Sequence, residues 1–219
     1  KGGGAVHIHS PGFTVSLTSS DNNYTRGTFV DAGNLTVSAS SLPVHARPAG
    51  ASCPSVANPL DACVAAGSSL TFSEHSDNDW AGIIGDAGSV AKTGVGALTW
   101  TQPQAYTGNT TVSEGTLFLN NTLETARIDV ANGATLGGLG LLTTTAPTHV
   151  AGTLAPGDAS TLGTLTLVGP VTFDSTSSLR VRVDPNKKHD TLKVAAGQPV
   201  TINPGAKLVV EGLPGDYLT

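Results

Sequence analysis

The chain has 219 residues, a formal net charge of −5, 12% charged residues, 5% aromatic residues and 27 glycines. A negative net charge argues against a nucleic-acid partner, whose phosphates require a basic surface. No apolar run is long enough to cross a membrane as a helix, so we expect no transmembrane segment. Because glycine, serine, threonine and valine are poor helix formers, the composition favours short strands joined by tight turns.

The chain begins Lys-Gly-Gly-Gly without a signal-peptide pattern, as expected after a cut within a longer polypeptide. Alternating apolar and polar residues predict early strands at residues 5–9, 13–17, 28–30 and 34–38. His7 and His9 share one face of the first strand, but no third ligand is near, so we expect a solvated face and no metal. In the second strand the residues expected to face inward are Phe13, Val15 and Leu17.

Residues 40–68 break this pattern, because their prolines cannot donate to a central strand ladder. The span also holds both cysteines of the chain, Cys53 and Cys63. We predict that they form a disulfide, which would close a loop of roughly ten residues and stabilise the fold by about 2–3 kcal/mol. Two free buried thiols are the alternative. A disulfide would place the protein in an oxidising compartment.

This proline-rich loop is the best candidate in the chain for a feature that faces a partner, since long loops in compact domains are often functional. A loop that only covers the neighbouring strands is an equally good interpretation. The sequence does not identify the partner, which would be a ligand on a host or bacterial surface. The candidate interaction residues are Arg47, Pro48, Pro54 and Pro59.

The most polar stretch follows at residues 74–80. Asp77 and Asp79, with Asn78 between them, could converge on a calcium ion in a tight turn. The stretch lacks the central glycine and the terminal glutamate of a helical calcium loop, and it is not the glycine-rich repeat of calcium β-rolls. We therefore predict no metal site here.

From residue 80 onward, short strands alternate with glycine-bearing turns, and no hairpin dipeptide joins the strands. This pattern predicts a solenoid of parallel coils about 4.8 Å apart, with roughly 20–25 residues in each of roughly nine coils. At residues 178–183 we expect Arg180 and Arg182 to face solvent, and residues 184–190 to form a solvated polar turn. The residues expected to face the core nearby are Leu165, Leu167, Leu179, Val181 and Val183.

No catalytic motif is present, because the sequence lacks a Gly-x-Ser-x-Gly elbow, a phosphate-binding loop and a His-Glu-x-x-His zinc motif. Polysaccharide-cleaving β-helices cluster their acids on one sheet face, whereas Asp86, Asp129, Asp158 and Asp174 are scattered and mostly lie beside turns. We therefore predict no catalytic, cofactor-binding or metal-binding residues in this chain. A carbohydrate-active β-helix enzyme is the alternative.

A series of short motifs follows one order through the second part of the chain, beginning with Lys-x-Gly-x-Gly-x-Leu at residues 92–98. The later motifs are Tyr106-Thr107-Gly108, Thr110-Thr111-Val112, Gly115-Thr116-Leu117, Gly137-Gly138-Leu139-Gly140, Gly152-Thr153-Leu154-Ala155-Pro156-Gly157, Gly163-Thr164-Leu165 and Asp190-Thr191-Leu192-Lys193-Val194. In this order they resemble the passenger-associated repeat of bacterial autotransporters, the proteins of type V secretion. The resemblance covers about residues 80–217, with departures at Trp100, at Gln104-Ala105 and at residues 141–147.

The resemblance implies an all-β, right-handed parallel β-helix that is exported through the periplasm to the cell surface or the extracellular space. It implies an outer-membrane β-barrel as a C-terminal partner within the same polypeptide. It divides the chain into N-terminal coils at residues 1–79, with the loop at 40–68, a regular repeat at 80–214 and the start of a truncated autochaperone segment at 215–219. The implied function is a stalk that presents adhesive or effector regions, or the stem of a protease or esterase whose catalytic domain lies elsewhere.

Overall fold

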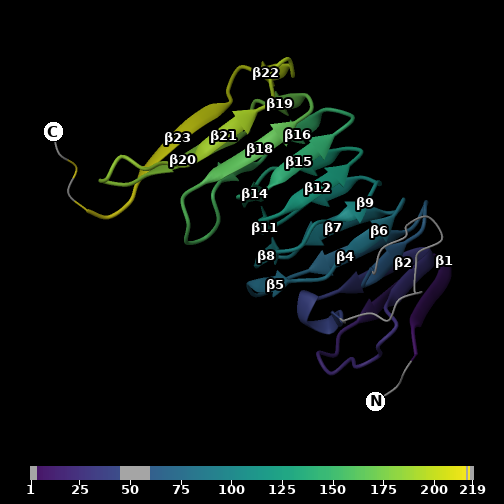
Figure 1. Ribbon diagram of the computed structural model, residues 1–219. Coiled ribbons are helices and arrows are strands. Elements are labelled where there is room, and N and C mark those ends of the chain that lie inside the picture. The colour runs from purple at the N-terminus through teal and green to yellow at the C-terminus, as the bar shows by residue number, and fades with distance from the viewer. Residues whose placement is uncertain (1–3, 45–59, 216, 218–219) are drawn as a thin grey trace.

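The computed structural model describes residues 4–44, 60–215 and 217, which wind into an elongated stack of strands (Figure 1). The strands form a 12-stranded, a 7-stranded and a 4-stranded sheet. Within each sheet they pair in parallel, each strand with its counterpart from the preceding coil. The fold is therefore all-β and a parallel β-helix, as the sequence predicts, and a right-handed sense is the rule for parallel crossover connections.

Each sheet takes one strand from most coils of the chain. The 12-stranded sheet contains β1 (Val6–Leu17), β2 (Thr28–Val37), β3 (Ala62–Val64), β4 (Ser69–Ser73), β6 (Ile84–Asp86), β7 (Ser89–Thr93), β9 (Ala105–Tyr106), β10 (Thr110–Val112), β13 (Ile128–Val130), β16 (Thr148–Val150), β19 (Val171–Phe173) and β22 (Val200–Ile202). The 7-stranded sheet contains β5 (Asn78–Trp80), β8 (Ala97–Trp100), β11 (Thr116–Leu119), β14 (Thr135–Gly138), β17 (Thr153–Pro156), β20 (Ser178–Val183) and β23 (Lys207–Gly212). The 4-stranded sheet contains β12 (Thr122–Thr125), β15 (Leu141–Thr144), β18 (Thr164–Val168) and β21 (Thr191–Val194).

The coils can be counted along the 12-stranded sheet. In the described part of the chain, nine of its strands stack in succession: β1, β2, β4, β7, β10, β13, β16, β19 and β22. Leu70 pairs with Val90, and Val90 with Thr110, so these coils take 20 residues each. The last coil is longer, because Val171 pairs with Val200, 29 residues further on. The predicted coil length therefore holds for the middle of the stack.

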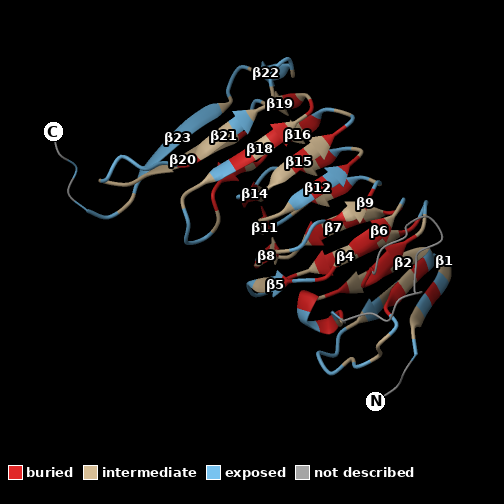
Figure 2. Cartoon of the chain, in the orientation of Figure 1, coloured by how far each residue is buried: buried red, intermediate tan, exposed pale blue. Residues whose placement is uncertain are grey.

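The interior is built from columns of aliphatic residues that repeat from coil to coil. Along the 7-stranded sheet, Leu98, Leu117, Leu136 and Leu154 lie in register, and all four are fully buried. Burial of each such side chain stabilises the fold by about 1.5–3 kcal/mol relative to exposure. Figure 2 shows this buried interior running through the middle of the stack and fading toward its C-terminal end.

Aromatic residues fill the interior of the coils around residues 72–106. The rings of Phe72 and Trp80 have centroids 5.1 Å apart, and Trp100 lies 6.1 Å from Phe72 and 6.2 Å from Tyr106. Trp100 also pairs in register with Trp80 on the preceding coil. The tryptophan at position 100, a departure from the repeat pattern, is therefore accommodated by an aromatic neighbour directly below it.

The structure alters the predicted loop and the first rung. The span at residues 40–68 was expected to leave the strands, but η1 (Ala39–Ser41) enters it and β3 returns to the sheet by pairing with Thr28–Val30 of β2. Phe13 does not face inward, because β1 shifts register between His9 and Thr14 and leaves this ring 73% exposed. In β18 the prediction is confirmed, since Leu165 and Leu167 are buried.

Candidate functional site

The predicted interaction loop cannot be placed as a site. Arg47, Pro48, Pro54, Pro59 and Cys53 lie outside the described residues. The loop's other cysteine, Cys63, is buried in β3 and packs with Leu60 in a small apolar cluster. The disulfide and the interaction role therefore stay predictions, and a thiol titration of the denatured chain, expected to find no free thiol, tests the first.

The lysine that opens the repeat motif lies inside the β-helix. Lys92 occupies an inward column between Phe72 and Val112, and only 1% of its surface is exposed. Its ammonium group donates to the backbone carbonyls of Thr93 at 2.9 Å, Gly94 at 2.7 Å and Glu114 at 3.1 Å. The side chain thus joins the corners of two successive coils from within.

The electrostatic surroundings of Lys92 explain why a charge is tolerated there. Burial lowers the pKa of Lys92, and the nearby carboxylates of Glu74, Glu114 and Asp77 partly offset that effect. Glu74 is itself fully buried and accepts hydrogen bonds from the backbone N–H of Ala39 at 2.6 Å and from Asn78 Nδ2 at 2.6 Å. A buried carboxylate with two donors and a cation nearby costs far less than an isolated one.

The glycines of the opening motif fit the same corner. Gly94 has φ of +77°, and a Cβ at that position would lie 2.3 Å from the carbonyl oxygen of Glu74. Its N–H donates to the Glu114 carboxylate at 3.2 Å. Only glycine meets both conditions, so the motif Lys-x-Gly describes a corner in which side-chain charge and backbone approach are matched.

The aspartate of the last motif builds a second corner of this kind. The side chain of Asp190 is 1% exposed and pairs with Arg182, whose Nε lies 2.7 Å from Oδ2. Asp190 also accepts from the backbone N–H groups of Gly163 at 2.9 Å and Arg182 at 3.1 Å. The hydrogen bond to Asp190 raises the pKa of Arg182. Asp190 thereby fastens the start of β21 to β20 and to the segment before β18.

Two expectations for this region are therefore wrong. Asp190 does not belong to a solvated turn, because four donors hold it in the interior. Arg182 faces outward as expected, yet its side chain is only 13% exposed because the carboxylate draws it down. Arg180 remains half-exposed, at 41% of its side chain, and so agrees with the prediction.

The acids that a catalytic or metal site would need act as local structural supports. Asp77 accepts from the N–H of Ala97 at 2.8 Å, and Asp129 pairs with Arg127, whose Nη2 is 2.7 Å away. Asp158 accepts from the N–H of Thr161 at 2.8 Å. Within residues 4–44 and 60–215, no group of three or more His, Cys, Asp or Glu residues is close enough to hold a metal ion.

Near the N-terminus a histidine–aspartate contact lies on the outer surface. His7 Nδ1 is 2.8 Å from Asp31 Oδ2, and the imidazole stacks on Phe29 with ring centroids 4.6 Å apart. The side chains of His7 and Asp31 are 58% and 45% exposed, so the pair contributes little to stability. The predicted solvated face is thus a paired but open one.

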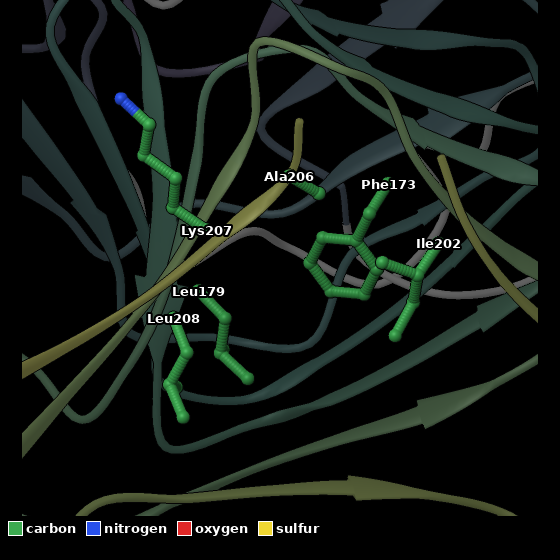
Figure 3. A pocket seen from close by; sticks show the side chains of 6 residues that line it. All are labelled: Phe173, Leu179, Ile202, Ala206, Lys207 and Leu208. Carbon is green, nitrogen blue, oxygen red and sulfur yellow. The ribbon is translucent and has the colours of Figure 1, made fainter. Parts of the chain in front are cut away.

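The C-terminal end of the stack carries the largest exposed apolar surface. Phe173, Leu179, Ile202, Ala206, Lys207 and Leu208 line a cavity of about 300 Å³ there. In Figure 3 the rings and aliphatic side chains gather around this hollow, while Lys207 extends away from it. Ile202 is 67% exposed and Leu208 is 66% exposed, because no further coil covers them among the described residues.

Sequence reasoning missed several of the residues that hold the corners. Gln104, noted only as a departure from the repeat pattern, is buried and accepts from the N–H of Ile84 at 3.0 Å. Its amide nitrogen donates to the carbonyls of Gly82 and Gln102, both at 3.0 Å. Glu74 also gave no signal beyond its polarity. Only the inward turn of the chain at these corners identifies such residues.

Comparison with known proteins gives one similarity that bears on function. The chain is 32% identical over 126 residues to a protein of Serratia marcescens named extracellular serine protease. The similar stretch is 58% of this chain but only 12% of that protein, so the chain spans a small part of its relative. No protein-family model matches the chain. In the described residues, no helix has the length and apolar character needed to span a membrane.

Proposed function

We propose that this chain forms part of the stem of a secreted or surface-displayed autotransporter passenger. The observation that carries the proposal is that the repeat-motif residues Lys92, Gly94 and Asp190 are consumed in building coil corners. A motif used in this way produces a long, uninterrupted rod, which is what a stem requires. The similarity to part of an extracellular protein of Serratia marcescens supports the same reading.

The open C-terminal end fits this role. A rod that ends in exposed Ile202 and Leu208 presents unpaired strand edges, which further chain can cover by adding a coil. We propose that more of the same polypeptide covers this end, and that the outer-membrane barrel implied by the autotransporter resemblance follows it. The rod would then hold regions on its N-terminal side, including the loop with Arg47 and Pro48, away from the cell.

Localisation on intact cells tests the stem proposal. Antibodies raised against the purified chain should label unpermeabilised cells of the source organism, or detect the protein in the culture medium. Added protease should remove the cell-surface signal, whereas a cytoplasmic control protein should survive. Labelling only after lysis would contradict the proposal, because a stem of a passenger must be outside the cell.

The name of the Serratia relative favours one version of this role, in which the stem carries a protease domain outside this chain. We expect the isolated 219-residue chain to show no peptidase activity, and the complete polypeptide to cleave casein in a manner blocked by a serine-directed inhibitor. If the complete polypeptide is inert, the stem instead presents adhesive or effector regions. Peptidase activity in the chain alone would contradict both versions.

A further inference from the structure

A second cavity lies on the outer face of the 7-stranded sheet, about 310 Å³ in volume and separate from the apolar end of the rod. We call it the arginine pocket. It lies among β11, the end of β17, β20 and β23, and the lining residues that matter here are Phe118, Pro156, Asp158, Arg180, Arg182 and Glu211. None of these residues has a role in the stem proposal except Arg182, which supports the corner at Asp190.

The pocket exists because two strands part. Strand β17 pairs with β20 only through Thr153 and Leu154, whereas β20 continues to pair with β23 as far as Val183 and Gly212. Figure 1 shows β20 and β23 extending beyond the rest of the stack. Beyond Leu154 the chain therefore leaves a hollow that no strand fills, which is a feature of this coil in particular.

The floor of the hollow is apolar. Phe118 lies in an outward row with Gly137 and Ala155 of the next two strands. A Cβ at Gly137 would lie 3.0 Å from the Phe118 ring and 2.6 Å from the carbonyl oxygen of Ala155, so the absence of a side chain there makes room for the ring. With Pro156 beside it, the ring offers a flat surface of the kind that packs against C–H groups.

The rim offers hydrogen-bonding groups that the fold leaves unused. The Arg180 guanidinium has Glu211 as its polar partner among the described residues, and the contact between Nη1 and Oε2 is 3.7 Å, beyond hydrogen-bond range. The donor fork of one and the acceptor oxygens of the other therefore stand side by side without satisfying each other. A ligand hydroxyl, which both donates and accepts, can bridge two such groups.

The other polar groups of the pocket restrict the charge of a ligand. Asp158 accepts from Ser160 and Thr161 N–H and from Asn120 Nδ2, and Arg182 is committed to Asp190 and to the carbonyl of Thr161. An anionic ligand at Arg180 would meet the carboxylates of Asp158 and Glu211, and a cationic ligand at Glu211 would meet two guanidinium groups. A neutral ligand with several hydroxyls avoids both repulsions.

We propose that the arginine pocket binds one sugar unit of a neutral glycan, with neighbouring hydroxyls bridging Arg180 and Glu211 and the apolar sugar face over Phe118 and Pro156. The volume lies at the low end of the range for small-molecule sites, which suits a single ring more than a long oligomer. An open site with few polar contacts predicts weak affinity, with a Kd on the order of 1–10 mM. The inference concerns binding only and holds whether or not the chain is exported.

The test is a titration of the purified, isotope-labelled 219-residue chain with glucose, galactose, mannose and N-acetylglucosamine, followed by NMR. At least one neutral sugar should give saturable shifts at residues around the pocket, while glucuronate and glucosamine should bind more weakly. Arg180→Ser and Glu211→Gln should each weaken binding tenfold or more. Arg127→Ser, which removes another exposed arginine paired with a carboxylate on a different sheet, is the matched control and should leave binding unchanged.

Three outcomes would overturn the proposal. The first is the absence of saturable shifts with every neutral sugar up to 100-fold above the expected Kd on the order of millimolar. The second is binding that Arg180→Ser and Glu211→Gln leave unaltered. The third is tighter binding of a charged sugar than of its neutral counterpart. Because Arg180 and Glu211 are both more than one-third exposed, their variants should keep the melting temperature of the parent, which separates lost binding from lost folding.

Discussion

Strands β14 and β23 belong to the same sheet and supply the same leucine column, but their surroundings differ. Leu136 of β14 is fully buried between Leu117 and Leu154, whereas Leu208 of β23 pairs only with Leu179 and is 66% exposed. Figure 2 shows the same contrast between the middle and the end of the stack. The two strands alternate alike in sequence, so the difference teaches that burial in a β-helix is supplied by the coil on each side.

The largest expected effect comes from this column. Leu136→Ala should lower the free energy of unfolding by about 4 kcal/mol, because it removes a buried side chain and leaves a cavity between two coils. Leu208→Ala should change it by less than about 0.5 kcal/mol, since the side chain is largely in water. Urea unfolding followed by circular dichroism measures both. Equal losses would mean that the end of the rod is covered in solution.

The next effect compares two ion pairs on neighbouring rows of β20. Asp190→Asn should cost about 2–3 kcal/mol, because the carboxylate is buried and leaves Arg182 without its counter-charge. Glu211→Gln should cost no more than about 0.5 kcal/mol, since its pair with Arg180 is exposed and 3.7 Å long. Thermal unfolding of both variants distinguishes them. A larger loss in Glu211→Gln would show that the corner at Asp190 is not the support described.

A smaller effect is expected at the corner of Lys92. Lys92→Met keeps the stem in the apolar column but removes the donor to three carbonyls, at a cost of about 1–2 kcal/mol. The folded-state pKa of Lys92 is below its usual value, so above that pKa the unfolded chain holds the proton more readily and wild-type stability rises toward the unfolded value of 10.5. The advantage of wild type over Lys92→Met should therefore grow between pH 8 and pH 10, about the range used for lysine titration.

Urea unfolding at the two pH values measures this difference. Lys207→Met, in the exposed last strand, is the control and should show no such trend. An advantage of wild type that shrinks as the pH rises would contradict the assignment of Lys92 as a buried charge.

The smallest expected effect is at Asp158. Burial opposes ionisation of this carboxyl, but hydrogen bonds from Ser160, Thr161 and Asn120 outweigh it and lower its pKa. Its contribution is present above the unfolded value of 3.8 and is lost as the pH falls through the folded value. Asp158→Asn should cost less than about 1 kcal/mol at neutral pH, given solvent screening, and still less below pH 3.

Melting temperatures at neutral and acid pH measure that change. Asp79→Asn serves as the control, because Asp79 is exposed and its side chain makes no hydrogen bond within residues 60–215. A cost for Asp158→Asn that increases on acidification would show that the aspartate does not act as a hydrogen-bonded carboxylate.

The sequence by itself determined the architecture of this protein. Alternation in strands such as β18 fixed which side chains face inward, since a one-residue slip would bury Thr166 and expose Leu165 and Leu167. Regular spacing of glycine-bearing turns predicted parallel coils of about the observed length. These features are local, because strand period and turn chemistry depend on residues only a few positions apart.

Only the tertiary structure decided which polar residues lie inside. Lys92 and Phe72 are 20 residues apart in sequence, and their shared column becomes visible only when successive coils are in register. The same holds for Asp190, which reaches Gly163 and Arg182 across coils, and for the arginine pocket, which depends on where β17 stops pairing with β20. Sequence patterns report distances along the chain, whereas hydrogen bonds, burial and cavities depend on contacts between coils.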